Sequence, residues 1–164
     1  MTRLRAMLVA ALGLLLAAPA LAYMFEAPLE EIVASSDLVV KGRVTGLQSR
    51  FLDSSTRFIV TDVTLSVDEV WAGTMGAGRT VTFTINGGEV GEIGMRQEHQ
   101  PVFSQGEEAL VFLRAGTDAR LAVNYAEQGK FTVRGEQAVG FKQMPIALKS
   151  LRGDVARLKP ARPR

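Results

Sequence analysis

The stretch RFIVTDVTLSVDEV, residues 57–70, alternates apolar and polar side chains over most of its length. In an extended strand Val63, Leu65 and Val67 lie on one face, because successive side chains point to opposite sides. Polar residues such as Asp62 and Thr64 lie on the other face. The stretch therefore predicts a strand with one buried face, long enough to bend across a small barrel.

Shorter runs that favour strands lie on both sides of this stretch. They are residues 38–44, 80–85, 109–113, 121–125 and 130–133. The run 109–113 is apolar throughout, which is typical of a strand covered on both faces. Helices are predicted over residues 28–35, which begin with a proline, and over residues 146–158. The second helix places four apolar residues on one stripe, namely Leu148, Leu151, Val155 and Leu158.

Together these elements predict a mainly β fold. We expect a small OB-like barrel of five or six strands, with a short N-terminal helix and a C-terminal helix. Closure of the sheet removes the edges that a cysteine-free protein would otherwise expose. A flat β-sandwich is the alternative, since the number and spacing of strands do not separate it from a barrel.

The first 22 residues have the pattern of an export signal. Arg3 and Arg5 precede the apolar residues 6–18, and Pro19 is followed by Ala20-Leu21-Ala22, a small-residue cleavage site. We therefore expect cleavage near Ala22, a secreted or periplasmic location, and no membrane span in the mature chain. The expected domains are a signal peptide over 1–22, the barrel over 23–141, and a basic helix and tail over 142–164.

Charge is uneven along the expected mature chain. Without Arg3 and Arg5, basic and acidic residues are equal in number. Residues 142–164, however, contain seven basic residues and one acidic residue, so the rest of the mature chain is acidic. Such a tail attracts an acidic partner or membrane surface, or it is simply a solvated segment.

Residues 87–107, called the excursion below, show no strand or helix periodicity and are rich in Gly, Glu and Gln. Connections of this length are usually functional or disordered, so we predict that the excursion is a binding loop. The apolar mature N-terminus is the second expected part of the contact surface. The predicted partner-binding residues are Tyr23, Met24, Phe25, Gly87, Gly88, Glu89, Met95 and His99.

No pattern of catalytic residues supports an enzyme. His99 is the single histidine, too few for a zinc site even with Glu89, Glu92 and Glu98 nearby. The chain has no cysteine and no G-x-S-x-G motif for a nucleophile. The glycine-rich residues 73–80 lead into a strand rather than a helix, which favours a hairpin turn over a phosphate loop. We therefore expect no catalysis, metal or cofactor.

Nucleic acid is not expected as a partner. OB barrels often bind oligonucleotides on the face of strands two and three, where basic and aromatic side chains contact the chain. The predicted outer face here carries Asp62, Thr64, Ser66 and Asp68, and the two carboxylates would repel phosphate.

Several segments, in this order, carry a family resemblance: SDLVVKGRV (36–44), residues 58–70, Trp71-Ala72-Gly73, residues 81–85 and EEALVFL (107–113). The chain resembles the netrin-like module of the tissue inhibitors of metalloproteinases, and is similar to a broad set of secreted bacterial proteins. The resemblance implies a five-stranded OB-type barrel over about 30–133 and a secreted protease as partner. In those inhibitors an N-terminal cysteine chelates the protease zinc, whereas Tyr23 takes that place here.

The leading hypothesis is an exported, non-catalytic binding module that contacts another secreted or envelope protein through the excursion and the mature N-terminus. A protease inhibitor is one form of it. Two alternatives stay open: a structural or adhesive component of the cell envelope, and a hydrolase with an unrecognised site.

Overall fold

The computed structural model describes residues 26–53, 55–116 and 120–159. The predicted signal peptide and the predicted contact residues Tyr23, Met24 and Phe25 lie outside these ranges. No helix within them has the length and apolar character needed to cross a membrane. The elements follow in the order α2 (Leu29–Ser35), β1 (Leu38–Phe51), β2 (Ile59–Ala72), β3 (Thr80–Asn86), β4 (Gly88–Val90), β5 (Ile93–Met95), β6 (Glu108–Ala115), β7 (Leu121–Val123), the 3-10 helix η1 (Ala126–Gly129), β8 (Lys130–Arg134), β9 (Gln137–Gly140), β10 (Ile146–Ala147) and α3 (Leu148–Leu158).

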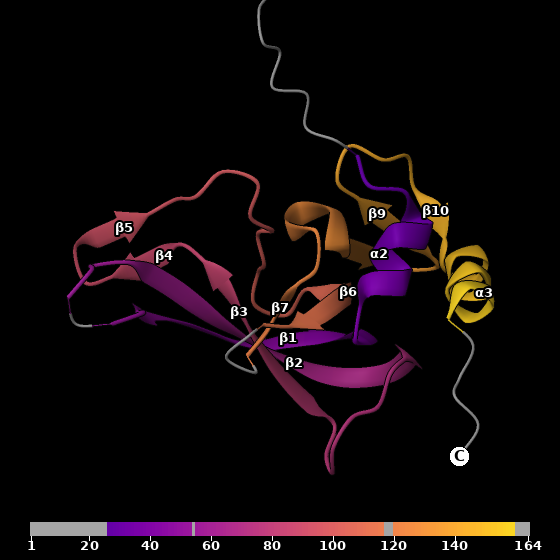
Figure 1. Cartoon of the computed structure of the whole chain (residues 1–164), viewed down its shortest axis with the longest axis horizontal. Coiled ribbons are helices and arrows are strands. Elements are labelled where there is room, and N and C mark those ends of the chain that lie inside the picture. Colours follow the sequence, from indigo (N-terminus) through magenta and orange to yellow (C-terminus); the bar gives the residue numbers. More distant parts are fainter. Residues whose placement is uncertain (1–25, 54, 117–119, 160–164) are drawn as a thin grey trace, which may run out of the picture.

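Five strands close a barrel, which confirms the predicted fold class and rules out the sandwich. Their order is β1-β2-β3-β7-β6, and β6 pairs back onto β1 over Leu38–Arg43 (Figure 1). Only the β3–β7 contact within this ring is parallel. This is the arrangement of a small OB-like barrel. Strands β8, β9 and β10 extend the sheet from the edge of β6.

The barrel interior is filled by the apolar face of the long second strand. Val63, Leu65 and Val67 of β2 are buried there, together with Phe83 of β3 and Val111 of β6. On the opposite face of β2, Asp68 is exposed and Asp62 is only half-buried. The alternation in the sequence therefore predicts the buried face correctly.

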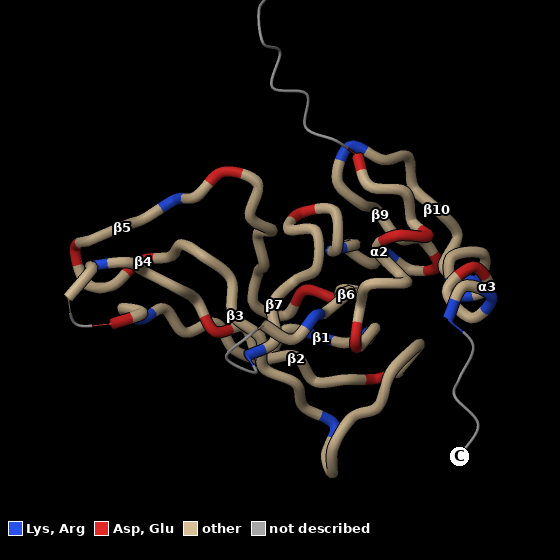
Figure 2. Tube along the Cα trace, viewed as in Figure 1, with Lys and Arg blue, Asp and Glu red and all other residues tan. Residues whose placement is uncertain are grey.

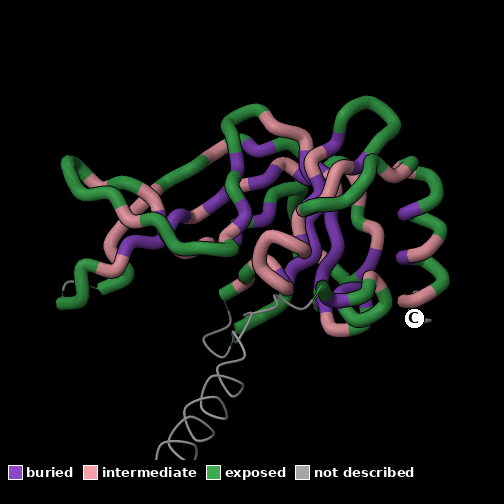
Figure 3. The backbone as a smooth tube through the Cα atoms, turned by 90° about the horizontal axis from the view of Figure 1, so that it is seen from above, coloured by how far each residue is buried: buried purple, intermediate pink, exposed green. Residues whose placement is uncertain are grey.

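A second apolar core lies outside the barrel, under the two helices. Leu110 and Phe112 of β6 pack there against residues of both helices, including Ile32 of α2 and Leu151 and Val155 of α3. Strand β6 is thus covered on both faces, as its apolar run predicts, and residues 109–113 are fully buried. Figure 3 shows buried residues gathered in the barrel and beneath the helices, while the chain of the excursion is largely exposed.

Some elements differ from the sequence-based expectation. The first strand continues beyond residue 44 to Phe51. The alternation in the sequence stops at residue 44 because a register shift between Val44 and Gly46 interrupts the period of two. The last helix begins at Leu148 rather than 146, since Ile146 and Ala147 first pair with β9. Strand β9 was not expected. The excursion is not irregular throughout, because it contains the β4–β5 hairpin.

Candidate functional site

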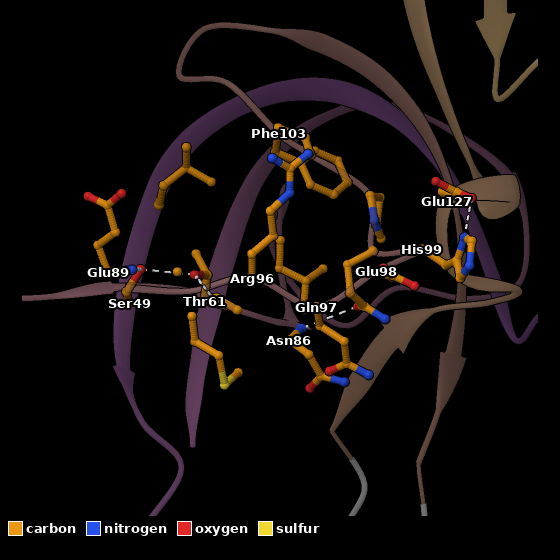
Figure 4. Close-up of a pocket in the computed structure, with 18 of the residues that line it drawn as sticks. Ser49, Thr61, Asn86, Glu89, Arg96, Gln97, Glu98, His99, Phe103 and Glu127 are labelled. Carbon is orange, nitrogen blue, oxygen red and sulfur yellow. Dashed lines mark hydrogen bonds and ion pairs between the residues drawn. The ribbon is translucent and has the colours of Figure 1, made fainter. Parts of the chain in front are cut away.

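A groove of about 1250 Å³ lies where β1, β2 and β3 run beyond the closed part of the barrel. Its floor is the face of these strands that continues the barrel interior, since Leu47 of β1 pairs with Val63 of the core. Its walls come mainly from the excursion (Figure 4). The lining includes five of the eight predicted contact residues, namely Gly87, Gly88, Glu89, Met95 and His99.

Two hydroxyl groups hold the start of the excursion to the floor of the groove. Thr61 Oγ1 donates to the Gly87 carbonyl (2.7 Å), the Ser49 and Thr61 hydroxyls lie 2.9 Å apart, and the Glu89 N–H donates to Ser49 Oγ (3.3 Å). Because the Thr61 proton is used, Ser49 donates to Thr61, and the bonds form one continuous chain. The two hydroxyl groups thereby hold the backbone on both sides of Gly88.

Gly88 permits this close approach. Its φ is +135°, which side-chain-bearing residues rarely adopt, and a Cβ atom there would lie 2.3 Å from Thr61 Oγ1 and 2.4 Å from Ser49 Oγ. The chain therefore crosses directly over two hydroxyl groups. The predicted contact residue Gly88 is required by backbone geometry at the groove floor.

The far end of the groove is held by contacts to the 3-10 helix η1. His99 Nδ1 lies 3.1 Å from Glu127 Oε1, and the Glu127 N–H donates to the His99 carbonyl (3.2 Å). His99 is exposed and has a φ of +61°. Ser49, Thr61 and Glu89 lie at one end of the groove, and His99 and Glu127 at the other (Figure 4). His99 thus contributes to holding the excursion in place.

A partly buried ion pair ends the excursion. The Lys130 ammonium lies 2.5 Å from Glu107 Oε1, and both side chains are 12% exposed. Thr132 Oγ1 and the Ser104 N–H also donate to this carboxylate. Burial raises the pKa of Glu107, but the hydrogen bonds from Lys130, Thr132 and Ser104 and the Lys130 charge lower it more, so it lies below the usual value.

The groove combines apolar surface with unpaired charge. Leu47 is 39% and Val102 70% exposed, although both are apolar. In the described part of the chain, the carboxylates of Glu89 and Glu98 and the guanidinium of Arg96 form no ion pair. Figure 2 shows acidic positions on β4, at the turn between β4 and β5 and in the chain after β5, which also carries one basic position. Such a lining offers both apolar contacts and charged groups to a ligand.

Within the described residues, no group of three or more His, Asp or Glu side chains is placed to hold a metal ion. Residues 73–79 connect β2 to β3, so that a strand and not a helix follows them, as the sequence predicts. On the outer face of β2, Asp62 is bound by Arg50 (2.6 Å) and Thr84 (2.8 Å), so its charge is already paired.

The sequence pattern does not indicate the groove residues that lie outside the excursion, among them Ser49, Thr61 and Glu127. Ser49 and Thr61 lie opposite each other only through the β1–β2 register, which depends on the shift near Gly46. No local motif carries that information, so only a correct pairing of the two strands could have indicated them.

No protein-family model matches the chain, and the curated proteins and solved structures give no significant match either. The resemblance to the netrin-like module therefore stays a prediction.

Proposed function

We propose that this chain is an exported, non-catalytic binding module that recognises another secreted or envelope protein in the groove beneath the excursion. One observation carries the proposal: the barrel ends in a large groove whose walls are firmly attached, yet whose lining offers exposed apolar side chains and unpaired charges. Surfaces of this composition serve protein recognition.

The attachment of the excursion supports this proposal. The hydroxyls of Ser49 and Thr61 hold the start of the excursion. Glu127 contacts His99 farther along, and Lys130 pairs with Glu107 at the last residue. A binding surface that is already ordered loses less conformational entropy when a partner docks. The rigid barrel thus serves as the support and the excursion as the recognising element.

Site-specific photo-crosslinking tests the proposal. A photoreactive phenylalanine analogue replaces Val102, which is exposed in the groove, and in a matched variant it replaces Lys149, which is exposed on α3. In cells that export the chain, position 102 should give a discrete adduct with a second exported protein, identified by mass spectrometry. A secreted metalloprotease in the adduct would select the inhibitor form. No adduct at position 102, or the same adduct from position 149, would refute a groove-centred contact.

A further inference from the structure

Strand β1 has a free edge next to the groove. Its first six residues, Leu38–Arg43, pair with β6 on one side, and from Val39 onward the strand pairs with β2 on the other. From residue 45 to Phe51 it pairs with β2 alone among the residues that the structure describes. Natural proteins usually cover or disrupt such an edge, because its backbone groups are a template for another strand.

The register shows which backbone groups are free. The Leu52 N–H donates to the Phe58 carbonyl, so by the antiparallel alternation Arg50, Gln48 and Gly46 bond to β2. The N–H and C=O groups of the intervening residues, Leu47, Ser49 and Phe51, therefore point away from β2. No described residue forms a hydrogen bond with these groups.

The groove lies beside this edge and carries an unpaired acidic side chain. Leu47 and Ser49 both line the groove, so a strand added along β1 would direct alternate side chains into it. The Glu89 N–H donates to the Ser49 hydroxyl, and the exposed Glu89 side chain extends from beside Ser49 (Figure 4). A basic side chain on the added strand would meet this carboxylate.

From this geometry we infer that the groove binds an extended, basic polypeptide segment, which pairs with the free edge of β1 and places a Lys or Arg opposite Glu89. The inference rests on the proposed function and names its partner chemistry. Backbone hydrogen bonds along β1 supply affinity, and the groove selects alternate side chains. A folded partner would contribute the segment as an edge strand or an exposed loop.

Selection from a phage-displayed library of random 12-residue peptides tests the inference on the exported form of the wild-type chain. Selected peptides should carry a basic residue within an alternating apolar pattern. Single N-methyl groups are then placed at each peptide position in turn, and affinity is measured by fluorescence anisotropy. A loss of at least tenfold at every second position is expected, because only alternate N–H groups face β1. Since the protein is unchanged, misfolding cannot produce this period.

Charge selectivity is tested by Glu89→Lys, which should weaken the selected peptide at least tenfold. Glu92→Lys is the matched control: it makes the same charge change at the β4–β5 turn, outside the groove lining, and should change affinity less than twofold. Failure to select peptides, selection of acidic ones, or N-methyl effects without a period of two would overturn strand addition. So would a dimer of this chain that the peptide does not dissociate. Crosslinking from position 102 can still succeed in these cases, which separates this failure from failure of the proposed function.

Discussion

The hydroxyl of Ser49 lies 2.9 Å from that of Thr61, and both lie directly beneath Gly88. The two residues are opposite each other on β1 and β2, and together they bond to the backbone on either side of that glycine. The excursion is thus attached to the barrel by side chains from two strands that precede it in sequence.

Replacement of Gly88 should displace the excursion. In Gly88→Ala the new Cβ would overlap two hydroxyl oxygens and the residue would keep an unfavourable φ, so we expect a loss of about 1–3 kcal/mol in the free energy of unfolding. Urea denaturation measures it. Gly94→Ala on β5 is the control, since its nearest neighbour would be an ordinary 3.7 Å contact. Equal midpoints for the two variants would show that the close approach is unimportant.

The hydroxyl chain itself is tested by Thr61→Val. This change keeps the shape of the side chain but removes the donor to the Gly87 carbonyl and the acceptor for Ser49. We expect a cost of about 1–3 kcal/mol, because Thr61 is buried. Amide hydrogen exchange at Glu89 should quicken, while Thr64→Val on the opposite face of β2 should leave it unchanged. Unaltered exchange in Thr61→Val would argue against the attachment.

Acid should release the last part of the excursion. The pKa of Glu107 is lower in the folded state than in the unfolded state. Its contribution to the free energy of unfolding is therefore fully present above the unfolded pKa and is lost as the pH falls through the folded pKa. Glu107→Gln removes the charged partner of Lys130, which keeps its bond to the Val102 carbonyl, and should lower the free energy of unfolding by about 2–3 kcal/mol at neutral pH.

Stability curves measured by urea denaturation from pH 7 to pH 2 check this. The difference in free energy of unfolding between the wild type and Glu107→Gln should shrink as the solution becomes acidic. Glu92→Gln, at an exposed turn position, should have the free energy of the wild type at every pH. A constant difference between wild type and Glu107→Gln across this range would contradict the assignment.

The core beneath the helices should be sensitive to truncation at Phe112. This side chain is fully buried and packs against Phe131, with ring centroids 5.8 Å apart. Phe112→Ala leaves a cavity and should cost about 3–5 kcal/mol, seen as a lower melting temperature. Val102→Ala, at a 70% exposed position, should melt close to the wild type. A melting temperature of Phe112→Ala close to that of the wild type would mean that packing beneath the helices contributes little to stability.

The sequence predicts those parts of the fold whose pattern is local. The alternation around Val63 and Leu65 predicts a face that is buried, and the apolar run 109–113 predicts a strand with two covered faces. Strand β1 beyond Val44 was missed because a register shift disrupts its period. The β4–β5 hairpin was missed because its three-residue strands are too short and too glycine-rich to show one.

For the candidate site, the sequence indicates the excursion but not the residues of other elements that complete the groove. Gly87, Gly88, Glu89, Met95 and His99 are found in one groove, since they belong to one connected segment. The opposite wall depends on strand pairing and on contacts to residues far along the chain, such as Glu127 and Lys130. Those contacts follow from tertiary packing and leave no local signal.

We propose that recognition takes place in the groove beside the free edge of β1. Amide hydrogen exchange of the exported chain, alone and in complex with the partner captured from position 102, tests it most directly. We predict slowed exchange at Leu47, Ser49 and Phe51 and along residues 87–103, with α3 unaffected. A stable complex that leaves these amides unchanged and protects another surface would contradict the claim.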